Sequence, residues 1–276
     1  MKFGLKCLHP LQSLGKGLLI ACLISFSSFT HADNTLSLEE IGTMARMCVK
    51  VAFSGELEPH VVTTDMTPSR LTQAEMLDLS NLSLHTLPSW LSRFTKLRDL
   101  NLAKNALPLE ELDEVKAMRV LEVLDLSGNP LFSREHKPLT EFFTFLPNLR
   151  VLSLQDTNGI CGGESYGDFK NLQSLQKLDI GQNCIYEIDL ANFSSTLQEL
   201  DLSYNYLFDG GVKFVNMPAL QKLSIQKQGL DRKLHLPDEW GDAFMMQQLR
   251  VLDYDENVII PDGLERKLES WKSKSK

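Results

Sequence analysis

An eleven-residue pattern, L-x-x-L-x-L-x-x-N-x-L, recurs eight times along the chain and restricts its fold more than any other feature. The first, fourth and sixth positions of the copies hold 24 residues, of which 22 are leucine or isoleucine. The distance between successive copies stays between 22 and 29 residues, which is typical of stacked repeats and not of an ordinary globular core. The copies begin at Ala74, Leu97, Leu121, Leu149, Leu175, Leu197, Leu220 and Leu249.

The spacing of the apolar positions predicts how each repeat folds. The fourth and sixth residues are two apart, so on a short strand both side chains point inward while the fifth points outward. One repeat cannot bury such a strip alone, whereas repeats stacked at about 4.8 Å form a parallel sheet over a continuous core. With strands on one side and bulkier connections on the other, the pattern predicts a curved α/β solenoid, a horseshoe with its sheet on the concave face.

The ninth position of the pattern predicts a structural ladder. An amide side chain there can both donate to and accept from the backbone where the chain leaves the strand. Thr157 and Gln228 could do part of this work, whereas Leu82 in the first repeat cannot. The asparagines expected in the ladder are Asn105, Asn129, Asn183, Asn205 and Asn257.

The first 32 residues differ in composition from the rest of the chain. Three lysines are the only charges before Asp33, and an apolar run over residues 17–26 precedes a small-x-small end at 30–32. This order predicts a secretory signal peptide that is cleaved after Ala32. Two other interpretations stay open, a lipoprotein cleavage box at 19–22 and an uncleaved anchor. No later apolar run is long enough to cross a membrane.

The segments on either side of the repeats are expected to close the ends of the solenoid. Residues 37–40, Ser-Leu-Glu-Glu, form a capping box that predicts a helix to about Val51. The predicted organisation is a signal peptide at 1–32, an N-terminal helical cap at 33–73, eight repeats at 74–259, and a C-terminal cap helix with a basic tail at 260–276.

Charge and cysteine content limit the classes of partner. After cleavage the chain would carry 25 basic and 36 acidic side chains. Such a surface repels nucleic acid and anionic membranes, and it favours a protein partner with a basic or neutral surface. Three cysteines would remain, too few for a disulfide framework. Cys48 is expected to be a buried thiol, while Cys161 and Cys184 are either two thiols or a disulfide.

Motifs for catalysis or for metal and cofactor binding are absent from the sequence. It has no H-E-x-x-H, C-x-x-C or G-x-S-x-G motif and no phosphate loop, and its histidines lack the spacing of metal ligands. We therefore expect neither an enzyme nor a metal or cofactor. An enzyme component that recruits substrate is a weaker alternative, since about 17 residues follow Ile259. A structural role in the envelope is another.

Outward-facing strand residues are the candidate binding surface. They form an acidic face interrupted by two lysines, although Asp-Leu-Ser at these positions is also common as repeat filler. The candidate concave-face residues are Asp78, Asn101, Asp125, Ser153, Lys177, Asp179, Glu199, Asp201, Tyr204, Lys222, Ser224 and Asp253. Aromatic residues at the end of the fifth and sixth strands belong either to the interface or to the core, namely Tyr186, Tyr204, Tyr206 and Phe208.

Over residues 74 to about 259 the chain resembles leucine-rich-repeat proteins. The clearest copies are LEVLDLSGNPL at 121–131 and LQELDLSYNYL at 197–207. The resemblance implies the horseshoe fold and says little about function, because one fold carries many functions. In general plan an exported horseshoe resembles bacterial internalin-type proteins and receptor ectodomains. The expected function is therefore a secreted, periplasmic or cell-surface protein-binding module, and delivery to a host as an effector is compatible with it.

Overall fold

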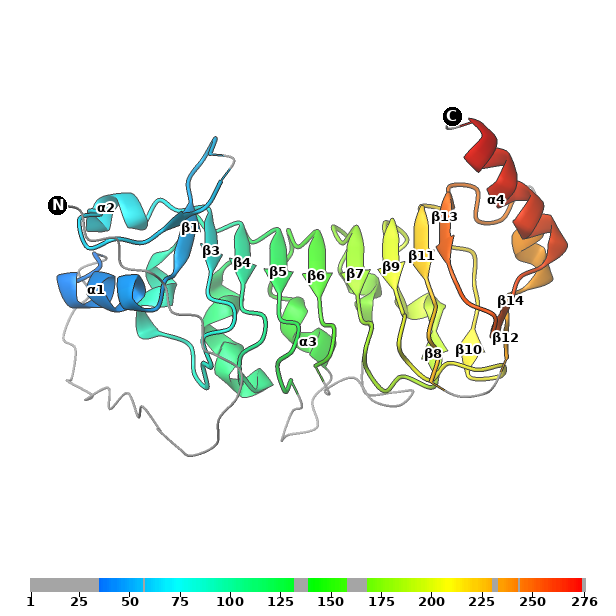
Figure 1. Ribbon diagram of the computed structural model, residues 1–276, viewed down its shortest axis with the longest axis horizontal. Helices are drawn as coiled ribbons and strands as arrows, with labels where there is room; N and C mark the ends of the chain where they lie inside the picture. Colours follow the sequence, from blue (N-terminus) through cyan, green and yellow to red (C-terminus); the bar gives the residue numbers. More distant parts are fainter. Residues whose placement is uncertain are drawn as a thin grey trace.

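A parallel sheet with one strand from each repeat forms the body of the molecule (Figure 1). The computed structural model describes residues 35–56, 58–131, 139–157, 168–229, 233–242 and 244–274. Each repeat strand is hydrogen-bonded to the strand of the next repeat, so the expected solenoid of eight repeats is confirmed. The strands are β3 (Met76–Asp78), β4 (Asp99–Asn101), β5 (Val123–Asp125), β6 (Val151–Ser153), β7 (Lys177–Asp179), β9 (Glu199–Asp201), β11 (Lys222–Ser224) and β13 (Val251–Asp253).

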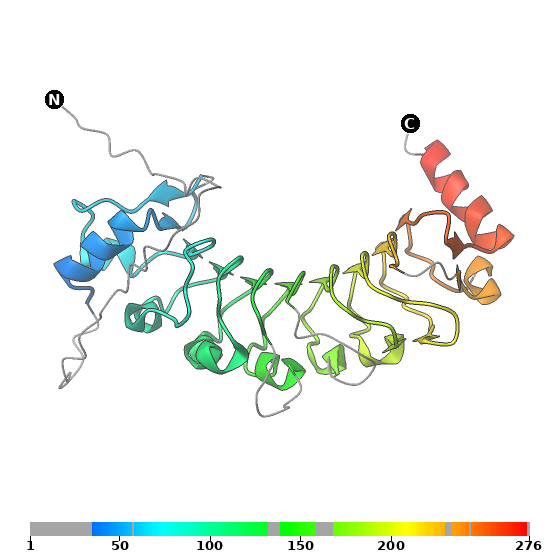
Figure 2. The same ribbon diagram turned by 60° about the horizontal axis from the view of Figure 1, so that its bottom comes forward.

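The connections between strands lie on the outer side of an arc, and the sheet lines its inner side (Figure 2). Helical turns are wider than strands, so neighbouring repeats lie farther apart on the outer side than on the inner side. This difference bends the sheet. The connections contain η1 (Ser89–Arg93), η2 (Leu109–Ala117), α3 (Leu139–Phe143), η3 (Phe169–Asn171), η4 (Leu190–Asn192) and η5 (Asp238–Gly241).

The core is a continuous strip between the sheet and the connections. Each of the seven repeat strands before β13 contributes its central leucine, and each of these side chains is at most 2% exposed. The register places them in one row, with Leu178 opposite Leu200 and Leu200 opposite Leu223. Leu252 of the last strand, β13, is only half-buried, since the sheet ends there.

Two small parallel pairs lie beyond the ends of the later repeat strands. In one, β8 (Ile188–Asp189) pairs with β10 (Val212–Lys213); in the other, β12 (Leu234–His235) pairs with β14 (Val258–Ile259). Each pair joins the segments that follow two successive repeat strands. The later repeats are therefore held together on this flank as well as through the main sheet.

The N-terminal cap begins with the expected helix, α1 (Leu38–Arg46). The Ser37 hydroxyl accepts the Glu40 N–H at 3.2 Å, and the Glu40 carboxylate accepts the Ser37 N–H at 2.7 Å. The helix ends earlier than the sequence pattern predicts, because Cys48 has a left-handed backbone with φ of 55°. Val51 therefore lies on a strand and not at the end of the helix.

The N-terminal cap contains strands as well as helices. β1 (Lys50–Ala52) pairs antiparallel with β3 and with β2 (His60–Val61), and these two strands extend the sheet to ten. A short helix, α2 (Pro68–Leu71), leads into the first repeat. An antiparallel hairpin pairs with the open edge of β3, so the cap covers main-chain groups as well as side chains.

The C-terminal helix α4 (Asp262–Lys274) packs against η5. Gly241 and Gly263 allow this contact, since a Cβ atom added to Gly241 would lie 2.9 Å from the Cα of Gly263. The predicted signal peptide lies outside the described residues, as do its alternatives. No helix in the described ranges has the length and apolar character that a membrane crossing needs.

Candidate functional site

The third and fifth residues of each repeat form two rows on the concave face. The register sets Lys177 beside Glu199 and Asp179 beside Asp201. Neighbouring strands are about 4.8 Å apart, so each row is a rigid series of adjacent side chains. The fifth-position row holds Asp78, Asn101, Asp125, Ser153, Asp179, Asp201, Ser224 and Asp253, and Lys177, Glu199 and Lys222 belong to the third-position row. Tyr204 lies in neither row, because it follows β9 at the end of that strand.

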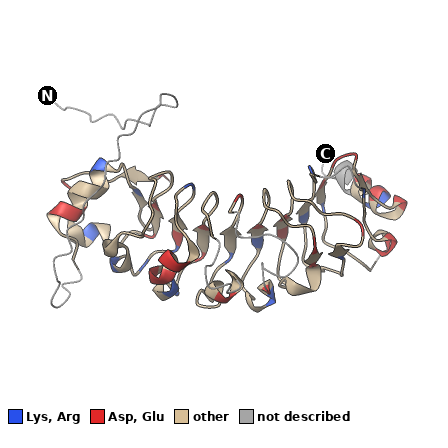
Figure 3. Cartoon of the chain, turned by 90° about the horizontal axis from the view of Figure 1, so that it is seen from below, with Lys and Arg blue, Asp and Glu red and all other residues tan. Residues whose placement is uncertain are grey.

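Lysines neutralise part of this face. Acidic and basic residues lie side by side along the strands (Figure 3). The ion pairs are Lys177–Glu199 at 2.7 Å, Lys222–Asp253 at 3.6 Å and Lys50–Asp78 at 3.4 Å. Within the described part of the chain, Asp125, Asp179 and Asp201 form no ion pair, and neither does the third-position Asp99. The uncompensated negative charge is therefore concentrated on the middle strands.

The fifth-position carboxylates also have a structural role that the sequence reasoning missed. The Oδ1 atom of Asp179 accepts the N–H of Gly181 at 2.9 Å, and that of Asp201 accepts the N–H of Ser203 at 2.8 Å. Asp78, Asn101 and Asp125 likewise each accept the N–H of the residue two positions later in the chain. This is the bond by which Asp and Asn stabilise turns, so the residue type at the strand end was the available signal. One oxygen of each Asp is used in this way; the second oxygen of Asp78 pairs with Lys50, whereas those of Asp125, Asp179 and Asp201 form no ion pair within the described residues.

Burial and mutual repulsion make ionisation harder on this face. Burial raises the pKa of Asp179; the hydrogen bond from Gly181 opposes the shift and the negative charge of Asp201 adds to it. Burial also raises the pKa of Asp99, with the neighbouring charges of Asp125 and Asp78 contributing. A cationic group placed over these strands would relieve the repulsion.

Asp179→Asn is expected to raise the midpoint of thermal unfolding at pH 7. The pKa of this carboxyl is higher in the folded protein than in the unfolded protein, so the carboxyl costs no stability below its unfolded-state pKa. As the pH rises through the folded-state pKa, ionisation of the carboxyl lowers the stability of the fold. The advantage of asparagine, which keeps the Oδ1 acceptor, should therefore disappear below about pH 4. Circular dichroism melts between pH 3 and 8 measure the difference.

A control of opposite sign is Asp209→Asn. Burial of Asp209 opposes ionisation, but hydrogen bonds from the His235 backbone and ring outweigh it and lower the pKa of this carboxyl. This substitution should lower the melting midpoint near neutral pH and lose its effect in acid. An equal shift for Asp179→Asn at pH 7 and pH 3 would show that charge is not the cause.

Three tyrosines are exposed together at the ends of the fifth and sixth repeat strands. Tyr186, Tyr204 and Tyr206 have exposed fractions of 46%, 49% and 42%. The Tyr206 N–H donates to the carbonyl of Ile185 at 2.8 Å, which places Tyr186 and Tyr206 on adjacent segments. Phe208 is half-buried. The tyrosines therefore form a second surface beside the concave rows.

Tyr204 occupies a strained backbone position, with φ of 58°. A left-handed backbone is costly for a bulky residue and is normally taken by glycine or asparagine. The corresponding residues of other repeats share this backbone, among them Lys104, Gly128 and Gln182 with φ of 56°, 67° and 51°. The left-handed turn is therefore a feature of the repeat, and in the sixth repeat it carries an exposed aromatic side chain.

The ninth-position amides lie between repeats. The Asn205 amide donates to the carbonyls of Ile180 and Leu202 at 3.1 and 2.9 Å, and its oxygen accepts the N–H of Ile185 at 3.1 Å. Gln228 bonds in the same way to Leu202, Ile225 and Leu207. Equivalent bonds are made by Asn105, Asn129 and Asn183.

Asn257 does not join this ladder. Its side chain is half-buried and makes no hydrogen bond within the described ranges. The main chain connects the repeats here instead, because the Leu234 N–H donates to the Asn257 carbonyl at 2.9 Å where β12 meets β14. The last repeat therefore uses a different joint.

Two cysteines depart from simple buried thiols. Cys48 and Cys184 are each half-buried, and each takes part in a disulfide whose other cysteine lies outside the described residues. The expectation of a buried thiol at Cys48 is therefore wrong. Cys161 lies outside the described residues, so its pairing with Cys184 stays a prediction. In the described ranges no group of three His, Cys, Asp or Glu residues could hold a metal ion.

Comparison with known families decides the family. Models described as Leucine Rich Repeat match residues 120–145 and 193–215, which contain β5 and β9 with the asparagines that follow them. The chain is a leucine-rich-repeat protein. Proteins with this fold are typically interaction modules without catalytic activity, and they generally mediate contacts between proteins.

Relatives of this leucine-rich-repeat protein differ greatly in length. It is 30% identical over 204 residues to the probable serine/threonine-protein kinase pats1 of Dictyostelium discoideum, covering 72% of this chain and 6% of the kinase. It is 31% identical over 169 residues to podocan of Mus musculus, covering 60% of this chain and 25% of podocan. The chain thus spans a quarter or less of these two proteins.

A solved structure supports the fold. Internalin C2 from Listeria monocytogenes superposes with a TM-score of 0.52 at 20% identity, covering 81% of this chain and 90% of internalin C2. The leucine-rich-repeat protein therefore has an internalin-like plan, and this likeness concerns the fold alone.

Proposed function

We propose that this leucine-rich-repeat protein is an exported module that binds a protein partner with a basic surface through its concave face. The observation that carries the proposal is the group of carboxylates on β5, β7 and β9 that no lysine of the described residues neutralises. Asp125, Asp179 and Asp201 lie on strands whose leucines are sealed in the core. A rigid array costs little ordering on binding, and complementary charge favours both association and selectivity.

Export rests on the signal peptide expected at residues 1–32. The location we propose is outside the cytoplasm, whether secreted, periplasmic or at the cell surface. Cell fractionation with mass spectrometry of the N-terminus tests it, and we expect a mature chain that starts at Asp33. An uncleaved chain confined to the cytoplasm would contradict this part of the proposal.

Removing the two central charges is expected to weaken partner binding by about tenfold or more, since charge pairs at interfaces often contribute more than 1.4 kcal/mol. The variant is Asp179→Asn with Asp201→Asn. Asparagine is preferred to lysine, because the Oδ1 atoms of both residues accept backbone N–H groups that lysine would leave unpaired. Residues 33–276 serve as bait, and the captured partner is then titrated by surface plasmon resonance.

The matched control removes the same charge elsewhere. Asp238 and Glu239 are exposed on η5, away from the concave rows, and Asp238→Asn with Glu239→Gln should leave affinity unchanged. Salt provides a second control. Screening limits electrostatic attraction to about 8 Å at 0.15 M, so the association rates of wild type and variant should differ most at low salt.

The exposed tyrosines supply the alternative site. Tyrosine is frequent at binding hot spots, because it buries a large rigid surface and retains a hydrogen bond. If Tyr186→Ala with Tyr206→Ala abolishes binding while the aspartate variant binds normally, the partner docks at the strand ends. If neither pair of substitutions changes affinity, the concave-face proposal is wrong.

A further inference from the structure

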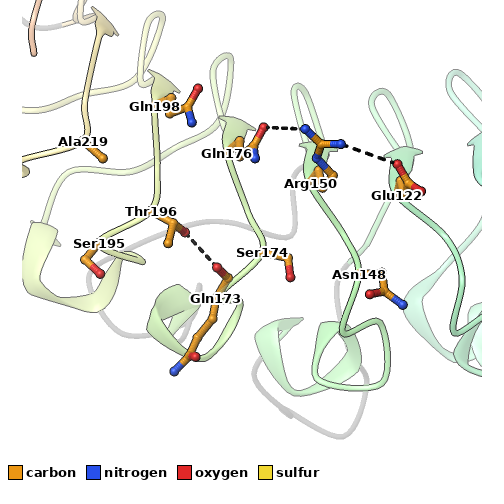
Figure 4. A pocket seen from close by; sticks show the side chains of 10 residues that line it. All are labelled: Glu122, Asn148, Arg150, Gln173, Ser174, Gln176, Ser195, Thr196, Gln198 and Ala219. Carbon is orange, nitrogen blue, oxygen red and sulfur yellow. Dashed lines mark hydrogen bonds and ion pairs between the residues drawn. The ribbon is translucent and has the colours of Figure 1, made fainter.

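A polar groove crosses the flank where the chain enters the strands, separate from the concave rows (Figure 4). Its volume is about 600 Å³. Two equivalent positions supply most of its lining: the residue just before the repeat pattern, at Asn148, Ser174, Thr196 and Ala219, and the second residue of the pattern, at Glu122, Arg150, Gln176 and Gln198. Gln173 and Ser195 complete the lining. The groove therefore runs along the solenoid axis, across β5, β6, β7 and β9, and repeats its chemistry at about the strand spacing of 4.8 Å.

The groove is electrically neutral. Of the residues that line it, only Glu122 and Arg150 are charged. They form an ion pair at 3.8 Å, and Arg150 also donates to the side-chain oxygen of Gln176 at 3.1 Å. The second position carries charge in the early repeats, at Arg98 and Glu122, and changes to glutamine at 176 and 198. A charged polymer would find little uncompensated opposite charge to bind in this groove.

The groove keeps hydrogen-bonding capacity that the fold does not use. The side chains of Gln173 and Gln198 make no hydrogen bond within the described ranges, and the amide nitrogen of Gln176 is likewise uncommitted. The hydroxyls of Ser174 and Thr196 donate to the carbonyls of Pro147 and Leu175 at 2.8 and 2.9 Å. The Ser174 oxygen keeps lone pairs that can accept, whereas the Thr196 oxygen also lies 2.7 Å from that of Ser194. The groove therefore offers both donors and acceptors.

We propose that this groove binds a linear neutral oligosaccharide. A sugar hydroxyl both donates and accepts, as does a carboxamide, so each glutamine can engage hydroxyls in either sense. A chain of similar sugar units presents such groups at regular intervals, which suits a groove with a regular repeat. An extended peptide would need pockets for alternate side chains, and Ala219 is the one apolar residue among those that line the groove.

The test uses four neutral hexasaccharides, namely cellohexaose, laminarihexaose, maltohexaose and chitohexaose, titrated into the mature chain with ¹H–¹⁵N NMR. We expect at least one to bind at millimolar concentration or tighter and to shift glutamine side-chain amides. Gln173→Ala with Gln198→Ala should weaken that binding about tenfold, since two hydrogen-bonding side chains are removed. Neither side chain bonds within the fold, so the melting midpoint should not change.

Gln221→Ala is the matched control. Gln221 is the second residue of the seventh repeat and does not line the groove, so its removal should alter affinity by less than about twofold. Binding of none of the four sugars overturns the proposal. So does an equal loss in the Gln221 variant, or binding of a Gly-Ser decapeptide in preference to all four sugars. The concave-face variant should retain sugar binding, so failure of one proposal leaves the other intact.

Discussion

Leu200→Ala is expected to lower the free energy of unfolding by about 2–5 kcal/mol, the range for truncating a sealed core leucine. Leu200 is 1% exposed and lies between Leu178 and Leu223 in the central row. The cavity would therefore separate three stacked repeats. A solenoid gains stability from contacts between neighbouring repeats, so nothing more distant can replace the lost packing. Urea denaturation followed by circular dichroism measures the change.

The equivalent residue of the last repeat provides the control. Leu252 has the same place in β13 but is only half-buried, so Leu252→Ala should lose clearly less stability. Equal losses at the two positions would mean that the end of the sheet is covered as completely as its middle. A loss below about 1 kcal/mol at Leu200 would be too small for a core leucine and would contradict the packing described above.

Asn205→Ala should have the next largest effect, a destabilisation of about 1–3 kcal/mol. The residue is 1% exposed, and its amide is bonded to the carbonyls of Ile180 and Leu202 and to the N–H of Ile185. Alanine would leave the buried Ile185 N–H without this partner, and it would remove one of the two amide donors from each carbonyl, since Ile180 keeps Asn183 and Leu202 keeps Gln228. The same denaturation experiment measures the loss.

Asn257→Ala is the matched control for the ladder. The side chain of Asn257 makes no hydrogen bond in the described ranges, so its removal should change stability by no more than about 0.5 kcal/mol. If Asn205→Ala and Asn129→Ala were both as harmless as this control, the ninth position would face water. The stabilising role assigned to the amides would then be wrong.

The repeat pattern predicted most of the fold because its information is local. Each copy carries inward residues two apart and an amide at the strand end, so any one repeat defines a strand, its buried side and its exit. The curved solenoid followed from stacking eight such units. The N-terminal cap was predicted less completely, since the pairing of β1 with β3 joins segments about 25 residues apart and leaves no period in the sequence.

The candidate surfaces were predicted only in part. The repeat pattern in the sequence was enough to predict the rows of outward residues. It was not enough to predict which of their charges remain uncompensated. Lys177 neutralises Glu199 because stacking places them on adjacent strands, whereas the register neighbours of Asp179 and Asp201 are Ser153, Ser224 and each other. The hydrogen bond that each of these aspartates accepts from the following turn also needed the folded backbone.

The sequence by itself determined the repeat, the inward and outward positions and the family, because the spacing of side chains along a strand is a property of the local chain. Only the tertiary structure decided which side chains meet between repeats. The neutral groove joins residues more than 20 positions apart, such as Arg150 and Gln176, and at Asn257 the main chains of β12 and β14 join the repeats in place of the ladder amide. Contacts of this kind depend on how far each connection carries the chain before the next strand, and the repeat pattern does not specify that length.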